Sequence, residues 1–351
     1  MDISALSLPV LAVIFMAAAV AIWFAGIKVS DTTDTLSKHF GLGEALGGMI
    51  ILAVVTNLPE MVIVITAALK NDLGLAIGNI LGGIALQTVV LVVLDTFGLG
   101  KKDPLTYKAV SLVLVLEGVL VLAVLSLVVM GHQLPAKLIF WHITPGSFLI
   151  FAVWMACVKI ISKAKKDLPW VTKDAPGPQQ KTPDKNSNKQ DHRQQKPIRK
   201  TIIVFMIAAL ITLVAGVALE ISSDAIAKQI GMQGVLFGAT VLAAATSLPE
   251  VSTGLASVKL KDYDLAISDI FGGNAFLPVL FLIATLISGK AILPTAQKSD
   301  IYLTGLGMLL TTIYIYGLIF RPRKQILHMG IDSFLVLIIY FLGIGGLFFI
   351  S

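Results

Sequence analysis

The sequence Leu-Ala-Val-Val-Thr-Asn-Leu-Pro-Glu at residues 52–60 occurs a second time, as Leu-Ala-Ala-Ala-Thr-Ser-Leu-Pro-Glu at residues 242–250. The offset of 190 residues holds without a gap from Ala25 to Thr88, and Gly26, Asp72 and Gly82 recur with it. An internal duplication of this length predicts a chain built from two related halves.

Each copy of the motif carries one carboxylate inside a long apolar segment, Glu60 in the first half and Glu250 in the second. A carboxylate in the bilayer is costly, so it is a functional-site candidate by default. In a continuous helix, Thr56 would lie one turn before Glu60, and Thr246 one turn before Glu250. Each copy is therefore expected to place a hydroxyl and a carboxylate on the same helix face.

Prolines 59 and 249 add a third oxygen ligand to each copy. Proline has no N–H, so the carbonyls of Val55 and Ala245 lose their helical partners. Hydroxyl, carboxylate and carbonyl oxygens suit Ca²⁺ or Na⁺ better than softer metals. Two facing copies would supply two negative charges, enough to balance one divalent cation. The structural alternative is a pair of proline-kinked helices whose glutamates form local hydrogen bonds.

The composition indicates a membrane protein. Of the 351 residues, 56% are hydrophobic and 14% are charged, whereas a soluble domain is nearer a quarter charged. The net charge of +6 comes largely from one loop and gives no indication of nucleic-acid binding. No phosphate loop, nucleophile elbow or metal-thiolate pattern appears, so the sequence predicts neither an enzyme nor a bound cofactor. It leaves the oligomeric state open.

Apolar segments long enough to span a bilayer predict ten transmembrane helices. The prediction is an all-α polytopic protein of two inverted five-helix repeats, because an odd number of spans per half reverses the second half. The two halves are residues 1–161, with a central region at 43–95, and residues 200–351, with a central region at 232–288. Polar connectors are expected at 29–42 and 219–232. The ten spans are expected near 6–28, 43–69, 73–95, 107–130, 138–161, 200–220, 232–258, 264–288, 300–320 and 330–350.

Residues 162–199 are rich in Lys, Gln, Asn, Pro and Asp, which is typical of a disordered linker. Lys and Arg concentrate in this linker and in the connectors on the same side of the predicted bilayer. By the positive-inside tendency, the linker is expected in the cytoplasm and both termini outside the cell membrane. The expected partners are membrane lipid and inorganic cations.

Glycine-rich segments follow the motif in both halves, at 78–83 and 268–274. Together with the doubled Thr-x-Leu-Pro-Glu, they resemble the α-repeats of the sodium/calcium exchangers, within the cation/Ca²⁺ antiporter superfamily. The resemblance implies a ten-helix transporter that exports Ca²⁺ against an inward flow of Na⁺ or H⁺. It implies Ca²⁺ ligands at Thr56, Glu60, Thr246 and Glu250, and flanking Na⁺ sites at Asn57 and Ser247.

Several positions depart from the family pattern. Gly83 and Gly273 stand where serine is usual, Gln87 and Leu277 where Asn or Asp is usual, and Asn57 where serine is usual. Leu277 cannot coordinate a cation. We therefore expect exchange to depend on H⁺ more than on three Na⁺ sites, since protons can occupy the glutamate pair when Ca²⁺ leaves. Restoring ligands by Leu277→Asp with Gly273→Ser is expected to raise the Na⁺ dependence.

Four further polar residues are possible accessory ligands, namely Asn79, Gln87, Asp269 and Asn274. Asp269 replaces the Asn79 of the first repeat, and it lies about 12 Å along the helix from Leu277 at ~1.5 Å per residue. It is interpreted either as a gate or proton-carrying group, or as a hydrated carboxylate near the cytoplasmic mouth. Glu117 is expected to be a structural residue, and Glu220 to lie at the membrane interface.

Three functions are compatible with these residues. The first is a secondary antiporter for Ca²⁺ or a similar cation. The second is a degenerate homologue that binds a cation as a sensor without exchanging it. The third is an exchanger whose coupling ion is H⁺ or K⁺ in place of Na⁺.

Overall fold

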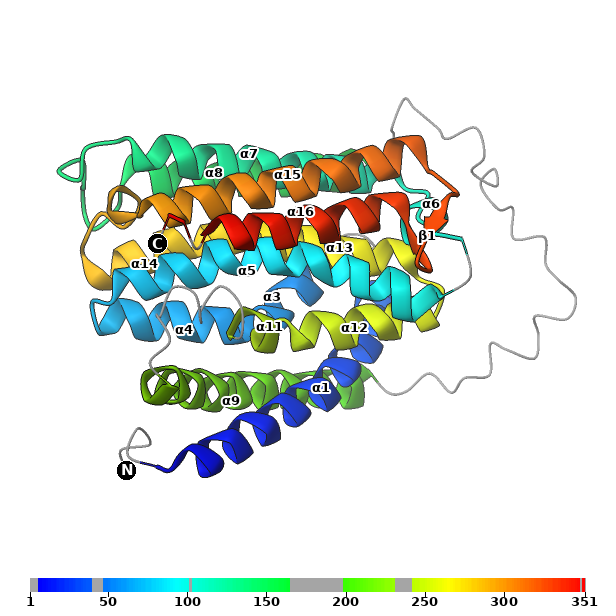
Figure 1. The fold of residues 1–351 in the computed structure, drawn as a ribbon, viewed down its shortest axis with the longest axis horizontal. Helices are drawn as coiled ribbons and strands as arrows, with labels where there is room; N and C mark the ends of the chain where they lie inside the picture. The colour runs from blue at the N-terminus through cyan, green and yellow to red at the C-terminus, as the bar shows by residue number, and fades with distance from the viewer. Residues whose placement is uncertain are drawn as a thin grey trace, which may run out of the picture.

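The computed structural model describes residues 6–39, 47–100, 103–164, 198–230, 242–347 and 349–350. Most of them are helical, with turns and one short antiparallel hairpin between the helices, and most of the long helices lie side by side, with α1 running obliquely to them (Figure 1). The predicted all-α architecture is confirmed.

The first half of the chain contributes five predicted spans, the second of which is broken. Its elements are α1 (Leu8–His39), η2 (Gly47–Leu52), α3 (Ala53–Thr56), α4 (Leu58–Leu69), α5 (Leu73–Val93), η3 (Leu94–Leu99), α6 (Leu105–Lys108), α7 (Leu112–His132) and α8 (Pro145–Ala164).

The second half repeats this order and adds the hairpin before its last helix. Its elements are α9 (Ile198–Ile230), α11 (Ala243–Thr246), α12 (Leu248–Lys259), α13 (Tyr263–Phe276), η6 (Leu277–Val279), α14 (Leu280–Ser288), η7 (Leu293–Thr295), α15 (Lys298–Phe320), β1 (Gln325–Ile326), β2 (Met329–Gly330) and α16 (Ile331–Leu347).

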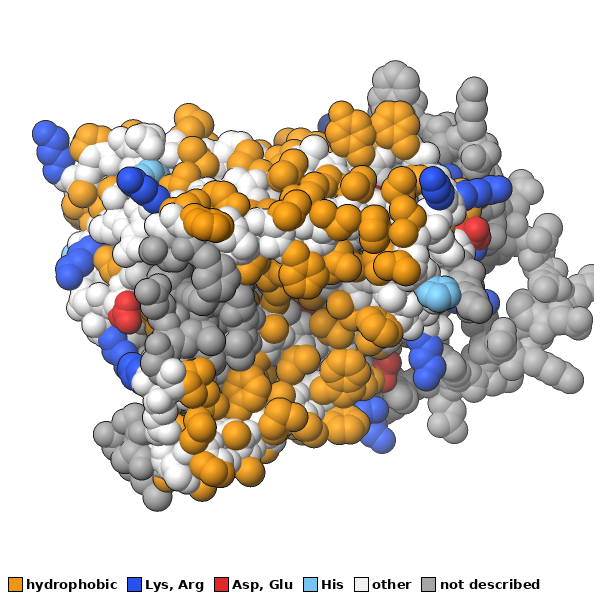
Figure 2. All heavy atoms as spheres, in the orientation of Figure 1, with side chains coloured by type: hydrophobic (Ala, Val, Ile, Leu, Met, Phe, Trp, Pro, Cys, Tyr) orange, Lys and Arg blue, Asp and Glu red, His pale blue; other side chains and the backbone are white. Residues whose placement is uncertain are grey.

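The helices are built to cross a membrane. Among the described residues, seven helices are long and apolar enough to do so, and the bent pair formed by 50–56 and α4 would be an eighth. The α11–α12 pair and the shorter apolar helix α16 lie at the other two predicted spans. Apolar side chains cover the middle of the visible surface, whereas lysines and arginines gather toward its two ends (Figure 2).

The predicted polar connectors at 29–42 and 219–232 are wrong, because helix continues through most of both segments. The helix α1 ends at His39 and α9 ends at Ile230. Hydroxyl groups in these segments bond back to their own helix, as Thr32 Oγ1 does to Lys28 O at 2.6 Å and Ser222 Oγ to Ala218 O at 2.7 Å. A short polar side chain satisfied in this way does not end a helix.

Two predicted spans begin later than expected. The fourth starts at Leu112, after the short helix α6, and the fifth starts at Pro145. Before Pro145 the chain turns at Trp141 and His142, whose φ angles are positive at 47° and 57°. This turn pairs Phe140 with Ile143 through two backbone hydrogen bonds of 2.8 Å, which is incompatible with helix.

The duplication is visible in local structure where α4 passes to α5 and α12 to α13. Asn71 and Lys261 both take left-handed backbone angles, with φ of 58° and 64°. The aspartates that follow, at 72 and 262, accept hydrogen bonds from Leu75 N at 3.2 Å and Leu265 N at 3.0 Å. An aspartate at this position satisfies an otherwise unpaired N–H and begins the helix.

The two halves run in opposite directions, and the first helix of each half packs against the other half. The helices α4 and α12 extend in opposite directions from the centre of the molecule, and α1 and α9 lie along one edge (Figure 1). A Cβ on Gly216 of α9 would lie 2.8 Å from Pro59 Cβ, and one on Gly26 of α1 would lie 3.3 Å from Pro249 O. The first helix of each half therefore packs against the proline break of the other half.

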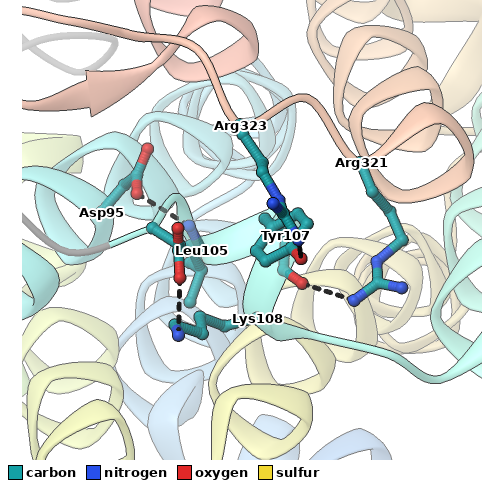
Figure 3. A network of polar contacts seen from close by, with 7 residues as sticks. Asp95, Leu105, Tyr107, Lys108, Arg321 and Arg323 are labelled. Carbon is teal, nitrogen blue, oxygen red and sulfur yellow. Dashed lines mark hydrogen bonds and ion pairs between the residues drawn. The ribbon is translucent and has the colours of Figure 1, made fainter. Parts of the chain in front are cut away.

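A group of polar contacts joins the halves at one end of the helices (Figure 3). The carboxylate of Asp95 accepts backbone hydrogen bonds from the first residue of α6 at 2.8 Å and from Gly330 of β2 at 2.7 Å. Nearby, the guanidinium groups of Arg321 and Arg323 lie over the Tyr107 ring, 5.0 and 4.6 Å from its centroid. These contacts fix the end of η3 to the hairpin.

Candidate cation-binding site

Each repeated motif lies at a break between two helices. In the first half, α3 ends at Thr56, and the segments on either side of Asn57 are bent by 56°. Ser247 occupies the matching break, and the backbone angles agree, with φ and ψ of −84° and 13° at Asn57 and −81° and 2° at Ser247. Each proline is at the start of the following helix, where a missing N–H costs little. The glutamates lie in the first turns of α4 and α12, where the helix dipole favours negative charge.

The two glutamates from opposite halves meet at one amide group. The Gln87 amide nitrogen, on α5, lies 3.1 Å from Glu250 Oε1 and 3.5 Å from Glu60 Oε1. It also donates to Asn57 Oδ1 at 2.8 Å. All four side chains are fully buried. The structure thus brings the two predicted carboxylates together inside the protein.

The threonines pair across the halves and not within them. The break at Asn57 separates Thr56 from Glu60, so the expectation that they share one face of a continuous helix is wrong. The Thr56 side chain instead contacts the Glu250 carboxylate, and Thr246 contacts that of Glu60. Each motif threonine is therefore a neighbour of the glutamate of the opposite repeat.

Several oxygens at this place lack a hydrogen-bond partner within the described part of the chain. They belong to two carboxylates and two amides, and all are buried. Buried oxygens without a partner are rare in folded proteins and indicate a missing ion or water. An all-oxygen donor set with two carboxylates matches a hard divalent cation. The atoms are Glu60 Oε2, Glu250 Oε2 and Gln87 Oε1 at the glutamate pair, and Asn274 Oδ1, whose amide nitrogen donates to Thr88 Oγ1 at 3.0 Å.

Four of the residues that depart from the family pattern form two neighbouring pairs, namely Gly273 with Gln87 and Gly83 with Leu277. A Cβ on Gly273 would lie 2.6 Å from Asn57 Nδ2 and 3.3 Å from Gln87 Oε1, so the longer Gln87 side chain occupies space beside this glycine. A Cβ on Gly83 would instead lie 3.7 Å from Leu277 Cδ1. One pair thus includes an amide side chain and the other an apolar side chain. Because Leu277 faces Gly83, the double variant that restores a contacting pair is Leu277→Asp with Gly83→Ser, not with Gly273→Ser.

Asp269 does not lie at a hydrated mouth, contrary to one of the two sequence interpretations. It is fully buried on α13, where Thr56 Oγ1 donates to its Oδ1 at 3.2 Å and Thr253 Oγ1 to its Oδ2 at 2.7 Å. No three His, Cys, Asp or Glu side chains of the described residues are placed to hold one metal ion. Asp269 is therefore next to the glutamate pair but does not complete a three-carboxylate site with it.

The other predicted ligands have the following surroundings. Val55 and Ala245 are buried in α3 and α11, each one residue before a motif threonine. The side chains of Asn57 and Ser247 donate to the carbonyls of residues 53 and 243, at 2.7 and 2.8 Å. Asn79 is buried on α5, about two turns before Gln87.

Three buried groups outside the glutamate pair complete the account. Glu117 accepts a hydrogen bond from Ser268 Oγ at 3.0 Å, and its structural role stays a prediction. Glu220 is only 6% exposed, so it is buried among the helices, and its place at the membrane interface stays a prediction. Thr253 was not predicted to belong to the site. One signal was available in the sequence, because the matching residue of the first repeat is Ile63, so the hydroxyl is present in one half only.

Comparisons with known proteins cover both halves of the chain. The family model described as sodium/calcium exchanger protein matches residues 10–160 and 200–348. Inner membrane protein YrbG of Escherichia coli (strain K12) is 26% identical over 295 residues, which are 83% of this chain and 82% of YrbG. The putative antiporter CaxA of Alkalimonas amylolytica is 24% identical over 273 residues, 77% of this chain and 78% of CaxA.

The fold is also similar to that of a solved exchanger. A structure of the sodium-calcium exchanger NCX_Mj soaked with Na⁺ and Sr²⁺ superposes with a TM-score of 0.65 at 15% identity. The superposition covers 97% of this chain and 99% of that chain. The family match includes both copies of the broken-helix motif and confirms the resemblance seen in the sequence. The chain belongs to the sodium/calcium exchanger protein family, whose members are membrane transporters of inorganic cations and not enzymes.

Proposed function

We propose that the protein is a secondary antiporter that exports Ca²⁺, or a similar divalent cation, in exchange for Na⁺ or H⁺ by alternating access. The observation that carries the proposal is the meeting of Glu60 and Glu250 at the Gln87 amide, with one unpartnered oxygen on each carboxylate among the described residues. The two charges come from opposite halves. A relative movement of the halves would therefore assemble or open the site.

The contacts around the glutamates favour a reduced number of Na⁺ sites. Gly83 and Leu277 lie against each other, and neither has a side-chain oxygen to offer a cation. The Gln87 amide nitrogen already lies between the carboxylates, in the position a cation would take. We propose that H⁺ replaces part of the Na⁺ coupling, because protons can balance the glutamates without further ligands.

We expect proteoliposomes with the purified protein to take up radioactive Ca²⁺ under an imposed pH gradient, and to show a shallow dependence on an imposed Na⁺ gradient. The reason is the loss of Na⁺ ligands at positions 83 and 277. The same measurement under an imposed K⁺ gradient tests whether K⁺ is the coupling ion instead. Empty liposomes, and liposomes with the Glu60→Gln variant, are the controls.

Two outcomes would contradict parts of this proposal. A steep, multi-ion Na⁺ dependence without any response to a pH gradient would remove H⁺ as the counter-ion. Saturable Ca²⁺ binding without flux under any gradient would instead favour the cation sensor, the second function that the missing ligands allow.

We further propose that both termini face outward from the cell membrane, with the 162–199 linker in the cytoplasm. The beginning of α1 and the end of α16 lie at one end of the molecule, and α8 ends and α9 begins at the other (Figure 1). In a Cys157→Ser background, a cysteine at linker position 186 should resist an impermeant reagent in intact cells and react after lysis. Deleting 174–194 should leave Ca²⁺ flux unchanged. Labelling from outside would mean that the orientation is the opposite of the one proposed. Loss of flux after the deletion would mean that the linker is needed for transport.

A further inference from the structure

We propose that Asp269, Thr56 and Thr253 form a site for a second cation, a singly charged alkali-metal ion, beside the glutamate pair. The carboxylate of Asp269 is held between two hydroxyls, one from α3 in the first half and one from α12 in the second. A hydroxyl that donates its hydrogen to a carboxylate keeps two acceptor lone pairs. The three side chains therefore present oxygen atoms only, as a hard cation requires.

The number of charges is the first argument for a second ion. One divalent cation balances Glu60 and Glu250 and leaves Asp269 without a counter-charge. Within the described residues, none of these three carboxylates forms a salt bridge or interacts with a lysine, arginine or histidine. A buried carboxylate that is neither paired nor bound to a metal is neutralised by a proton instead, and the response to pH in the test below separates that alternative. Since the three carboxylates do not gather around one metal position, an ion that balances the third charge would need a site of its own.

The second argument is a comparison inside the chain. At the matching positions of the first repeat, Asn79 stands for Asp269 and Ile63 stands for Thr253. The same backbone arrangement therefore forms without the carboxylate and without the second hydroxyl. Asn79 Nδ2 has no hydrogen-bond partner within the described ranges. This is expected, because residue 63 offers no hydroxyl to pair with the side chain at position 79. The paired change in one half only indicates a ligand and not a requirement of the fold.

The third argument is the connection to the divalent site. The Thr56 side chain contacts both Asp269 and Glu250, and the charges of these two carboxylates interact. Glu250 Oε2 is buried without a hydrogen-bond partner in the part of the chain that is described, so it remains open to a cation. An ion bound at one site would therefore change the electrostatic potential at the other site. This inference rests on the proposal that Glu60 and Glu250 hold the transported divalent cation.

The test measures alkali-ion binding without Ca²⁺, by equilibrium dialysis of radioactive Na⁺ and, in place of K⁺, radioactive Rb⁺ against the purified full-length protein. The wild type is expected to bind one of these ions saturably. Asp269→Asn should remove this binding, and Thr253→Val should weaken it about tenfold. Glu117→Gln is the matched control: another buried carboxylate, whose partner Ser268 is adjacent to Asp269 in sequence, and it should bind as the wild type does.

A second measurement separates this inference from the proposed function. Calorimetric Ca²⁺ titration should show Asp269→Asn still binding Ca²⁺, whereas Glu60→Gln should not. If Glu60→Gln keeps normal Ca²⁺ affinity while Asp269→Asn loses alkali binding, the proposed function fails and the alkali site stands. If Asp269→Asn and Thr253→Val bind alkali ions as Glu117→Gln does, or differ from it only in their response to pH, the alkali site is wrong. Thermal melting of each variant identifies any loss of folding.

Discussion

Glu60→Gln and Glu250→Gln are each expected to weaken divalent-cation binding at least ~100-fold, which corresponds to about 2.7 kcal/mol. Both carboxylates are fully buried and contact the same Gln87 amide, so they act on one ion. Glutamine keeps the size and one acceptor oxygen but removes one of the two charges that balance a divalent cation. A charge left partly unbalanced in an interior of low dielectric is strongly unfavourable.

Calorimetric titration with Ca²⁺ measures the effect directly. Glu117→Gln controls for the loss of a buried carboxylate elsewhere in the bundle and should keep wild-type affinity. Because the repeats place the two glutamates equivalently, the two site variants should be similarly impaired. Near-normal affinity in either one would mean that its carboxylate is not a ligand.

Gly273→Ala is expected to weaken Ca²⁺ binding by about tenfold or more, since small displacements of ligands are costly in a preorganised site. The new Cβ would lie 2.6 Å from Asn57 Nδ2, which is far too close, and 3.3 Å from Gln87 Oε1. Asn57 must then move, and it is the acceptor that holds the Gln87 amide at 2.8 Å. The amide that joins the two carboxylates would shift with it.

The internal duplication supplies a matched control for this substitution. Gly83 is the equivalent residue of the first repeat, and its added Cβ would lie at an ordinary distance of 3.7 Å from Leu277 Cδ1. We therefore expect Gly83→Ala to change Ca²⁺ affinity by less than about twofold. Equal effects at the two glycines would show that the loss follows from the helix and not from contact with the Asn57–Gln87 pair.

The sequence was sufficient for the architecture because its signals are long and repeated. Ten apolar segments and an exact 190-residue offset predict the two halves and the position of Glu60 and Glu250. The ends of helices were predicted less well. The polar segment at 29–42 resembles a connector, but its hydroxyls bond within α1, and composition alone does not reveal where a side chain finds its partner.

Contacts between the halves were the main feature that the sequence concealed. The spacing of Thr56 and Glu60 suggested a pair within one repeat, whereas the helix break directs each threonine to the other half. Gln87 was identified as a departure from the family pattern, but its three contacts depend on how α5 lies against both breaks. Asp269 likewise became interpretable only when Thr253 was found beside it.

The exchanged packing of the two halves has a consequence for biosynthesis. Gly216 packs against Pro59, and Thr246 lies beside the Glu60 carboxylate, and both come from segments translated much later. A chain emerges from the ribosome in order, and its early segments generally fold first. We therefore expect the first five spans to enter the bilayer before Gly216 can cover Pro59 and before Thr246 can lie beside Glu60. They become a finished unit only when the second half has been inserted in the reverse orientation.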